Sequence, residues 1–255
     1  MSQGGSYHED FTYEQDHGHC PGKDKGIYGK NCIIMPLFAL GFTLLMRILY
    51  GKMANGGSSA ESMNAYALSM GLVMNIGMCG IYCTSLLLAE EKEKKTLRVL
   101  MTSSVNGMEY FIGCILPVFA ATVILNYVLM PVSGYIISGK NLVLYSVVTI
   151  LSSLISCIIG MLLGIFAKNQ VSAGTITTPV LLVLMMVPMF SNFIEILSTI
   201  SKFFFTGILM DMIMDIAADK GSVLQAGSVV IMVVEAVLAV GLFVVCYRRN
   251  GFERD

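Results

Sequence analysis

Charged residues are scarce in this sequence. They make up 13% of the 255 residues, whereas about 25% is usual for a soluble domain. Hydrophobic residues make up 55%, and the mean hydropathy is +0.74. This composition excludes an ordinary soluble domain and predicts an integral membrane protein.

Histidine is absent after residue 19, so all histidines lie in the polar first 31 residues. A membrane-embedded enzyme would need His, Asp or Ser side chains gathered near the interface, and such a set is not found. In the tail, His17, His19 and Cys20 follow Asp16 and form a candidate transition-metal site. No later residue completes that site, so a solvated tail is the preferred interpretation.

Cysteine occurs seven times, which is an odd number, and none of the seven falls in an expected external loop. A disulfide framework is therefore not expected. Cys79 and Cys83 share a helix face, but no further ligand lies near them in the sequence. We interpret the cysteines in the apolar segments as packing residues, and we predict no metal site.

A nucleotide-binding motif is also lacking. Residues 18–24 superficially resemble a phosphate-binding loop. However, the spacing is one residue short, Asp24 replaces the usual Ser or Thr, and no strand precedes the loop. Any ATP chemistry must therefore belong to a partner protein. The net charge is −1, and we expect no nucleic-acid partner.

Six apolar segments are long enough to cross about 30 Å of hydrocarbon as helices of about 20 residues. They predict an all-α membrane domain over 32–247, between a largely flexible tail at 1–31 and a short C-terminus at 248–255. The tail has no apolar core, so no cleavable signal peptide is expected. The expected spans are 32–50, 63–89, 108–134, 142–167, 172–190 and 226–247.

Lysine and arginine are concentrated in the tail, in the loop near residue 95 and at the C-terminus. By the positive-inside bias, these three regions are cytoplasmic. The sequence therefore predicts a multi-pass protein of the cell membrane with both termini inside the cell.

Two of the expected spans carry distinctive small or bending residues. Pro117 and Pro131 loosen the backbone of the third span and favour bends. In the fourth span, small residues recur at every fourth position, which allows another helix to approach closely. These packing residues are Ser152, Ser156, Gly160 and Gly164.

Residues 191–225 form the longest expected external segment. Its apolar parts are too short to cross the membrane unaided, which predicts one or two re-entrant or interfacial helices. Asp211, Asp215 and Asp219 recur at four-residue spacing in this segment. We prefer an acidic stripe facing water over a rim that attracts substrate.

Two charged residues fall at membrane depth: Glu235 in the sixth span and Arg47 near the outer end of the first. Ionisable groups in hydrocarbon are costly and usually face a cavity or a partner. Glu235 is therefore a candidate for the outer half of a translocation path, or for a gate in which it pairs with Arg47. A protonated Glu235 that packs against a neighbouring helix explains the sequence equally well.

The strongest charge cluster lies between spans two and three, at residues 90–107. Acidic residues precede basic ones there at spacings that favour helix, so the second span should continue beyond the membrane surface. Leu97, Leu100 and Met101 then share one apolar face. A short surface helix with such a face fits the groove of a soluble partner, or it rests on lipid headgroups.

The six spans, the acidic and lysine run at 90–95, the Thr-Leu pair that follows it and the Ser-Ser-Val turn at 103–105 resemble the permease subunits of type-2 ATP-binding cassette exporters. The resemblance covers about residues 30–250. It implies that this region forms a coupling element that touches a cytoplasmic ATPase. The matching positions are Glu90, Glu91, Glu93, Thr96, Leu97, Leu100 and Val105.

The resemblance also implies partners: two copies of a separate ATPase that binds ATP and Mg, and a second permease, identical or paralogous. Lys95, Ser104 and Cys114 depart from the residues that the family often has.

The 19 methionines and the few charges favour an amphipathic or hydrophobic cargo, such as a peptide, a drug or a lipid-like molecule. A membrane immunity or sensor protein without transport, or an ion-coupled secondary transporter, is the alternative.

Overall fold

The computed structural model describes residues 30–53, 58–93, 107–191, 193–220 and 225–250, and within these ranges it is helical without strands. The helices are α1 (Lys30–Met53), α2 (Ser58–Asn75), the π-helix η1 (Ile76–Cys83), α3 (Thr84–Glu93), α5 (Gly107–Ser133), α6 (Lys140–Phe166), α7 (Gln170–Phe190), α8 (Glu195–Ser201), α9 (Phe205–Ala217) and α10 (Ala226–Asn250).

Six helical segments of the described chain are long and apolar enough to cross a membrane. This number and the all-helical architecture confirm the fold class predicted from the sequence. The spans are Ile33–Lys52, Ala60–Glu93, Gly113–Ser133, Lys140–Phe166, Gln170–Phe190 and Ala226–Tyr247.

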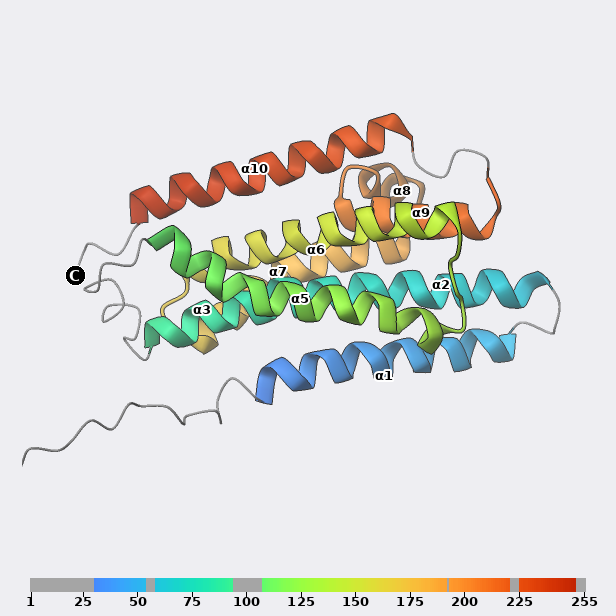
Figure 1. Ribbon diagram of the computed structural model, residues 1–255, viewed down its shortest axis with the longest axis horizontal. Coiled ribbons are helices and arrows are strands. Elements are labelled where there is room, and N and C mark those ends of the chain that lie inside the picture. The colour runs from blue at the N-terminus through green and yellow to red at the C-terminus, as the bar shows by residue number, and fades with distance from the viewer. Residues whose placement is uncertain (1–29, 54–57, 94–106, 192, 221–224, 251–255) are drawn as a thin grey trace, which may run out of the picture.

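The second span is the centre of the bundle (Figure 1). It consists of α2, η1 and α3 in direct succession and runs for 34 residues, and its most apolar stretch is 83% buried inside the protein. The equivalent share in the other spans is between 11% and 44%. The central helix contacts α1, α5, α6, α7 and α9, so a displacement of this helix reaches most of the fold.

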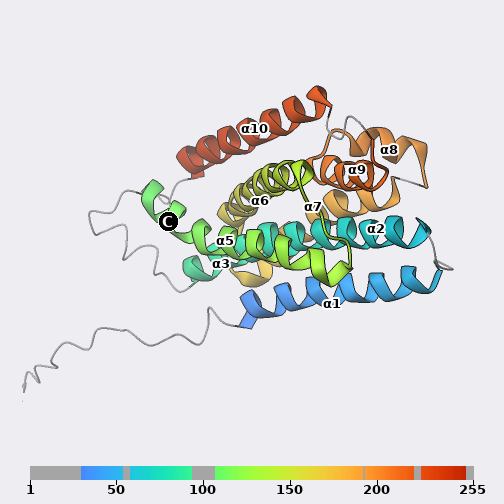
Figure 2. The ribbon, with the colours of Figure 1, turned by 45° about the vertical axis from the view of Figure 1, so that its right-hand side comes forward.

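The first and last spans lie on opposite sides of the bundle in both views (Figures 1 and 2). α1 packs on the central helix and α5, whereas α10 packs on α6 and α9. Both expose most of their apolar side chains, with only 11% and 17% of the respective windows buried. These faces are suited to contact with lipid or with another membrane subunit.

The bundle has two distinct ends (Figure 1). At one, which we call the α3 end, α3 and α6 end and α5 and α7 begin. At the other, the α8–α9 end, α8 and α9 form a pair bent by 104°. Two short helices thus lie in the segment for which the sequence predicted one or two.

A glycine allows the tight connection between α8 and α9. A Cβ atom on Gly207 would lie 2.0 Å from the carbonyl oxygen of Ser201. No side chain fits in that space, so the turn requires glycine.

The central helix contains a π-helix of eight residues at its middle. π-Helices are rare and usually span a single turn, and they are frequent at functional sites. Gly77 faces Met185 of α7, and Gly80 faces Ser156 of α6. Side chains of α7 and α6 therefore pack against the π-helix at its two glycines.

The prolines of the third span do not end its helix. Pro117 and Pro131 both lie inside α5, which is helical from Gly107 to Ser133. A proline leaves a backbone carbonyl of its helix without a hydrogen-bond partner. In a membrane protein, neighbouring helices can satisfy such a group, so the helix need not end at the proline.

Candidate functional site

The charged end of the central helix lies at the α3 end, beside the ends of three other helices. Glu90 and Glu91 are half-buried and Glu93 is exposed. The other residues predicted to contact an ATPase, Thr96, Leu97, Leu100 and Val105, lie outside the described residues. The geometry of the site therefore rests on the last turn of α3.

Lys92 joins this turn to α6. Its Nζ donates hydrogen bonds to the carbonyl oxygens of Gly164, at 3.2 Å, and Ala167, at 3.3 Å, and also to that of Ile165. Carbonyls in the last turn of a helix lack intrahelical partners, and the negative end of the helix dipole attracts a cation. Lys92 thus caps the C-terminus of α6 from the central helix.

Two acidic side chains of the same turn reach α7 and α5. The Glu93 Oε2 accepts a hydrogen bond from the backbone N–H of Gln170, the first residue of α7, at 3.3 Å. The thiol of Cys114 in α5 lies 3.8 Å from both carboxylate oxygens of Glu91. We call Glu91, Lys92 and Glu93 the α3 clamp, because together they connect α3 to α5, α6 and α7.

The α3 clamp contains two residues that the sequence analysis assigned to the coupling element and one residue that it did not single out. Glu91 and Glu93, predicted to touch an ATPase, have partners within the chain. Lys92 was not singled out, because its acceptors are backbone carbonyls more than 70 residues away. A lysine at the end of a long apolar helix was its only signal.

The small residues of α6 lie against the central helix. A Cβ atom on Gly160 would meet the carbonyl oxygen of Ile81 at 2.5 Å, and one on Gly164 would meet that of Ser85 at 3.1 Å. A Cβ atom on Gly80 would lie 1.9 Å from the Oγ of Ser156. The backbones of the two helices therefore approach closely along η1 and α3.

Ser152, the first residue of this small-residue series, is also buried. Its Oγ has no hydrogen-bond partner among the described residues. It lies one turn before Ser156 on the helix face that packs on the central helix.

A buried polar network crosses the bundle at the start of η1. The Nδ2 of Asn75 donates to the Oδ1 of Asn126 at 2.7 Å and to the carbonyl oxygen of Thr122 at 3.0 Å. The Nδ2 of Asn126 in turn donates to the Oγ of Ser153 at 3.0 Å. The Tyr145 hydroxyl donates to the carbonyl oxygen of Asn126 at 2.6 Å. The network ties α2, α5 and α6 together.

We expect Asn75 and Asn126 to depend on each other. Replacing either residue by leucine should lower the free energy of unfolding by about 1 kcal/mol, because an interhelical hydrogen bond in a membrane contributes about that much. The double substitution should cost less than the sum, because the second change removes a bond already broken. Unfolding in mixed micelles of the two single variants and the double variant measures this coupling, and strict additivity would contradict the network.

The two charges at membrane depth have separate surroundings. The Nη1 of Arg47 donates to the carbonyl oxygen of Val132, near the end of α5, at 3.1 Å. Glu235 is half-buried in α10, where its carboxyl group interacts with the backbone N–H of Phe205 at the start of α9. Its Oε2 is buried without a hydrogen-bond partner among the described residues.

A direct pair between Arg47 and Glu235 does not form within one chain, which corrects the gate hypothesis in that form. Arg47 belongs to α1 and Glu235 to α10, on opposite sides of the bundle in both views (Figures 1 and 2). Arg47 instead satisfies a carbonyl at the end of α5. Whether either residue borders a translocation path stays a prediction.

The acidic residues of α9 and its following turn lie beside a lysine at the α8–α9 end. Asp215 pairs with Lys220, with the carboxylate oxygen 2.5 Å from Nζ. That hydrogen bond and the charge of Asp215 raise the pKa of Lys220. Asp211 and Asp219 are exposed.

The arrangement defines a multi-pass helical membrane protein whose buried central helix ends in a charged turn fixed to three neighbours. Residues 49–245 match the family described as ABC-2 family transporter protein, and the chain belongs to this family. Its members are non-catalytic membrane subunits of ATP-binding cassette transporters and work with an ATPase subunit. The resemblance found in the sequence is thereby confirmed. No curated protein matches the chain at a significant level.

Proposed function

We propose that this chain is the membrane subunit of an exporter that carries an amphipathic or hydrophobic cargo out of the cell. A second permease, identical or paralogous, would complete the pore, and two copies of a separate ATPase would bind ATP and Mg. The distribution of lysine and arginine supports a cytoplasmic location for the α3 end and both termini. The family supports the dependence on an ATPase.

The observation that carries this proposal is the central helix itself. It is buried along most of its length, and the α3 clamp fixes its charged end to α5, α6 and α7. ATP-driven closure of the ATPases pushes on residues 90–107, the first of which form the last turn of α3. Because packed helices move as rigid bodies, the push displaces the bundle around the central helix and is not absorbed locally.

The π-helix offers the place where this displacement is accommodated. Gly77 and Gly80 leave the contacts with α7 and α6 free of interlocking side chains on the central helix. The wider turn also has a different hydrogen-bond register from the flanking α2 and α3. The stroke therefore changes the packing of α6 and α7 against η1.

The cargo class follows from the chemistry of the helices. Described membrane-spanning segments carry few ionisable residues, and the chain has 19 methionines, a residue that adapts to varied apolar ligands. A peptide, a drug or a lipid-like molecule fits such surfaces. Glu235 is the candidate for a polar contact with the cargo in the outer half of the membrane.

Docking of the ATPase can be tested at the apolar face of the coupling element. Leu97→Asp with Leu100→Asp should abolish co-purification of the ATPase with the tagged chain, because it places two carboxylates in an apolar contact. Leu97→Met with Leu100→Met keeps the face apolar and is the matched control. If the ATPase still co-purifies with the aspartate variant, the docking assignment is wrong.

A further inference from the structure

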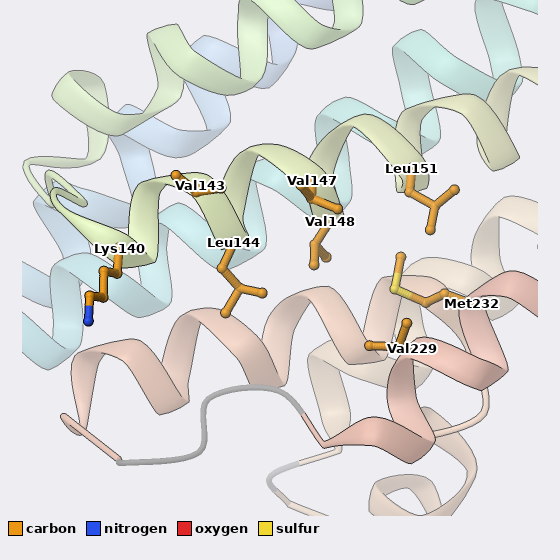
Figure 3. A pocket seen from close by; sticks show the side chains of 8 residues that line it. All are labelled: Lys140, Val143, Leu144, Val147, Val148, Leu151, Val229 and Met232. Carbon is orange, nitrogen blue, oxygen red and sulfur yellow. The ribbon is translucent and has the colours of Figure 1, made fainter.

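A groove lies between α6 and α10 in the half of the molecule nearer the α8–α9 end (Figure 3). Its volume is about 370 Å³. α6 contributes apolar side chains between Val143 and Leu151, and α10 contributes Val229 and Met232. Lys140 is the one charged residue of the lining. The volume is within the range of sites that bind small molecules.

The groove is open to the side and closed toward the α3 end. Val143 and Val147 are 66% and 59% exposed, so its mouth faces the surroundings of the bundle. Farther along the same two helices, Ile158 and Met161 of α6 pack in one cluster with Phe243 of α10. A ligand therefore enters from the lipid phase and extends toward a closed end.

The positive charge lies at the opposite end of the groove. Lys140 is the first residue of α6, and Figure 3 shows it at the end of the lining remote from Leu151 and Met232. The first turn of α6 has no acidic residue, and Gly139 before it gives no side-chain cap. Among the described residues, no carboxylate forms an ion pair with Lys140. An amine and a positive helix end thus favour an anion there.

The dimensions of the groove match one lipid chain. Lys140 and Leu151 are separated by about 16 Å along α6, at about 1.5 Å per residue. This is about half of a hydrocarbon core of about 30 Å, which is the depth of one leaflet. Over that length, 370 Å³ gives a mean cross-section of about 23 Å². A whole helix of a second subunit, about 10 Å across, is too wide to enter this space and would have to lie over its mouth.

We propose that this groove binds one acyl chain of a bilayer phospholipid with a net anionic headgroup. The phosphate lies at Lys140 and the start of α6, and the chain runs along α6 toward Leu151. The inference is independent of the cargo and of the direction of transport, because it concerns a resident lipid of the membrane subunit.

The headgroup decides which lipid is bound. An acyl chain is already surrounded by hydrocarbon in the bilayer, so contacts with valine and leucine give little selectivity. The attraction between a basic residue and an anionic headgroup corresponds to a preference of about five-fold. Lys140 should therefore select by charge, whereas the apolar walls only accommodate the chain.

Native mass spectrometry of the purified full chain tests the proposal, with phosphatidylglycerol and phosphatidylcholine that carry identical acyl chains. The wild-type chain should retain one phosphatidylglycerol about five-fold more often than one phosphatidylcholine. Lys140→Gln should abolish this preference, and Lys140→Arg should keep it. Lys202→Gln removes an exposed lysine at the same end, outside the groove, and should leave the preference intact.

Further variants separate the groove from its alternatives. Val147→Trp should reduce retention of both lipids, because the indole fills the space of the chain. Equal retention of the two lipids by the wild-type chain, or a preference that survives Lys140→Gln, would overturn the proposal. Disulfide cross-linking of two chains through Val147→Cys would also overturn it, since this face would then be a contact between subunits.

Discussion

Replacing Gly160 by alanine should destabilise the chain by about 3 kcal/mol, at the upper end of the usual cost of overpacking. The added Cβ would lie 2.5 Å from the carbonyl oxygen of Ile81 and 3.0 Å from that of Gly80. Both atoms belong to the backbone of η1. They cannot move aside as a flexible side chain would, so α6 and the central helix must separate.

The control is Gly241→Ala in α10, where no atom lies within 4 Å of the new Cβ. Both substitutions remove a glycine from a helix, so their effects on helix propensity are similar and cancel in the comparison. Thermal unfolding in detergent should show a clearly lower Tm for Gly160→Ala than for the control. Equal Tm values would mean that the close approach of the two helices does not limit stability.

The six spans were predictable because each is a long stretch of predominantly apolar residues. A membrane requires such runs whatever the tertiary structure, so composition and length suffice. The four-residue spacing in α6 likewise indicated a close helix contact. The sequence did not identify the partner, which the structure shows to be the central helix at Ile81 and Ser85.

The π-helix could not be predicted from its residues. Ile76–Cys83 is an apolar stretch that is compatible with an ordinary α-helix. The wider turn differs from an α-helix in its hydrogen-bond register. The role of its glycines becomes apparent only from their contacts with Met185 and Ser156 in other helices. Such information lies in tertiary packing and not in local sequence.

The contacts of the charged residues could not be predicted from the sequence for a related reason. Lys92 and Arg47 both donate to backbone carbonyls at the ends of other helices. Every residue has a carbonyl, so no residue type marks the acceptor. Complementary charges were sought instead, which suggested Arg47 as one possible partner of Glu235, and these two residues do not pair within one chain.

Replacing Lys92 by methionine should uncouple transport from ATP hydrolysis. The substitution keeps an unbranched side chain of similar length but removes the hydrogen bonds to the carbonyls of Gly164, Ile165 and Ala167. Bonds of this charged type contribute about 1.5–3 kcal/mol. We expect transport by the reconstituted complex to fall about ten-fold or more, since a loss of 1.4 kcal/mol in coupling corresponds to about ten-fold.

The docking surface should survive this change, because Lys92 contacts α6 whereas Leu97 and Leu100 are assigned to the ATPase. Co-purification and ATP hydrolysis should therefore stay near the wild-type level while transport falls. Lys168→Met removes a positive charge from the neighbouring turn between α6 and α7, where Lys168 is exposed, and should leave transport unchanged.

Three outcomes distinguish transmission from simpler roles of Lys92. Full transport by Lys92→Met would show that the α3 clamp does not carry the stroke. Joint loss of ATPase binding and transport would place Lys92 in the docking surface. A lower Tm with transport and hydrolysis reduced in equal proportion would indicate a purely structural cap of α6. The hydrogen bonds of Lys92 join α3 to α6 at the end of the bundle where the ATPase pushes. Without them the stroke reaches α3 but no longer moves α6. Only continued ATP hydrolysis with loss of transport fits this mechanism.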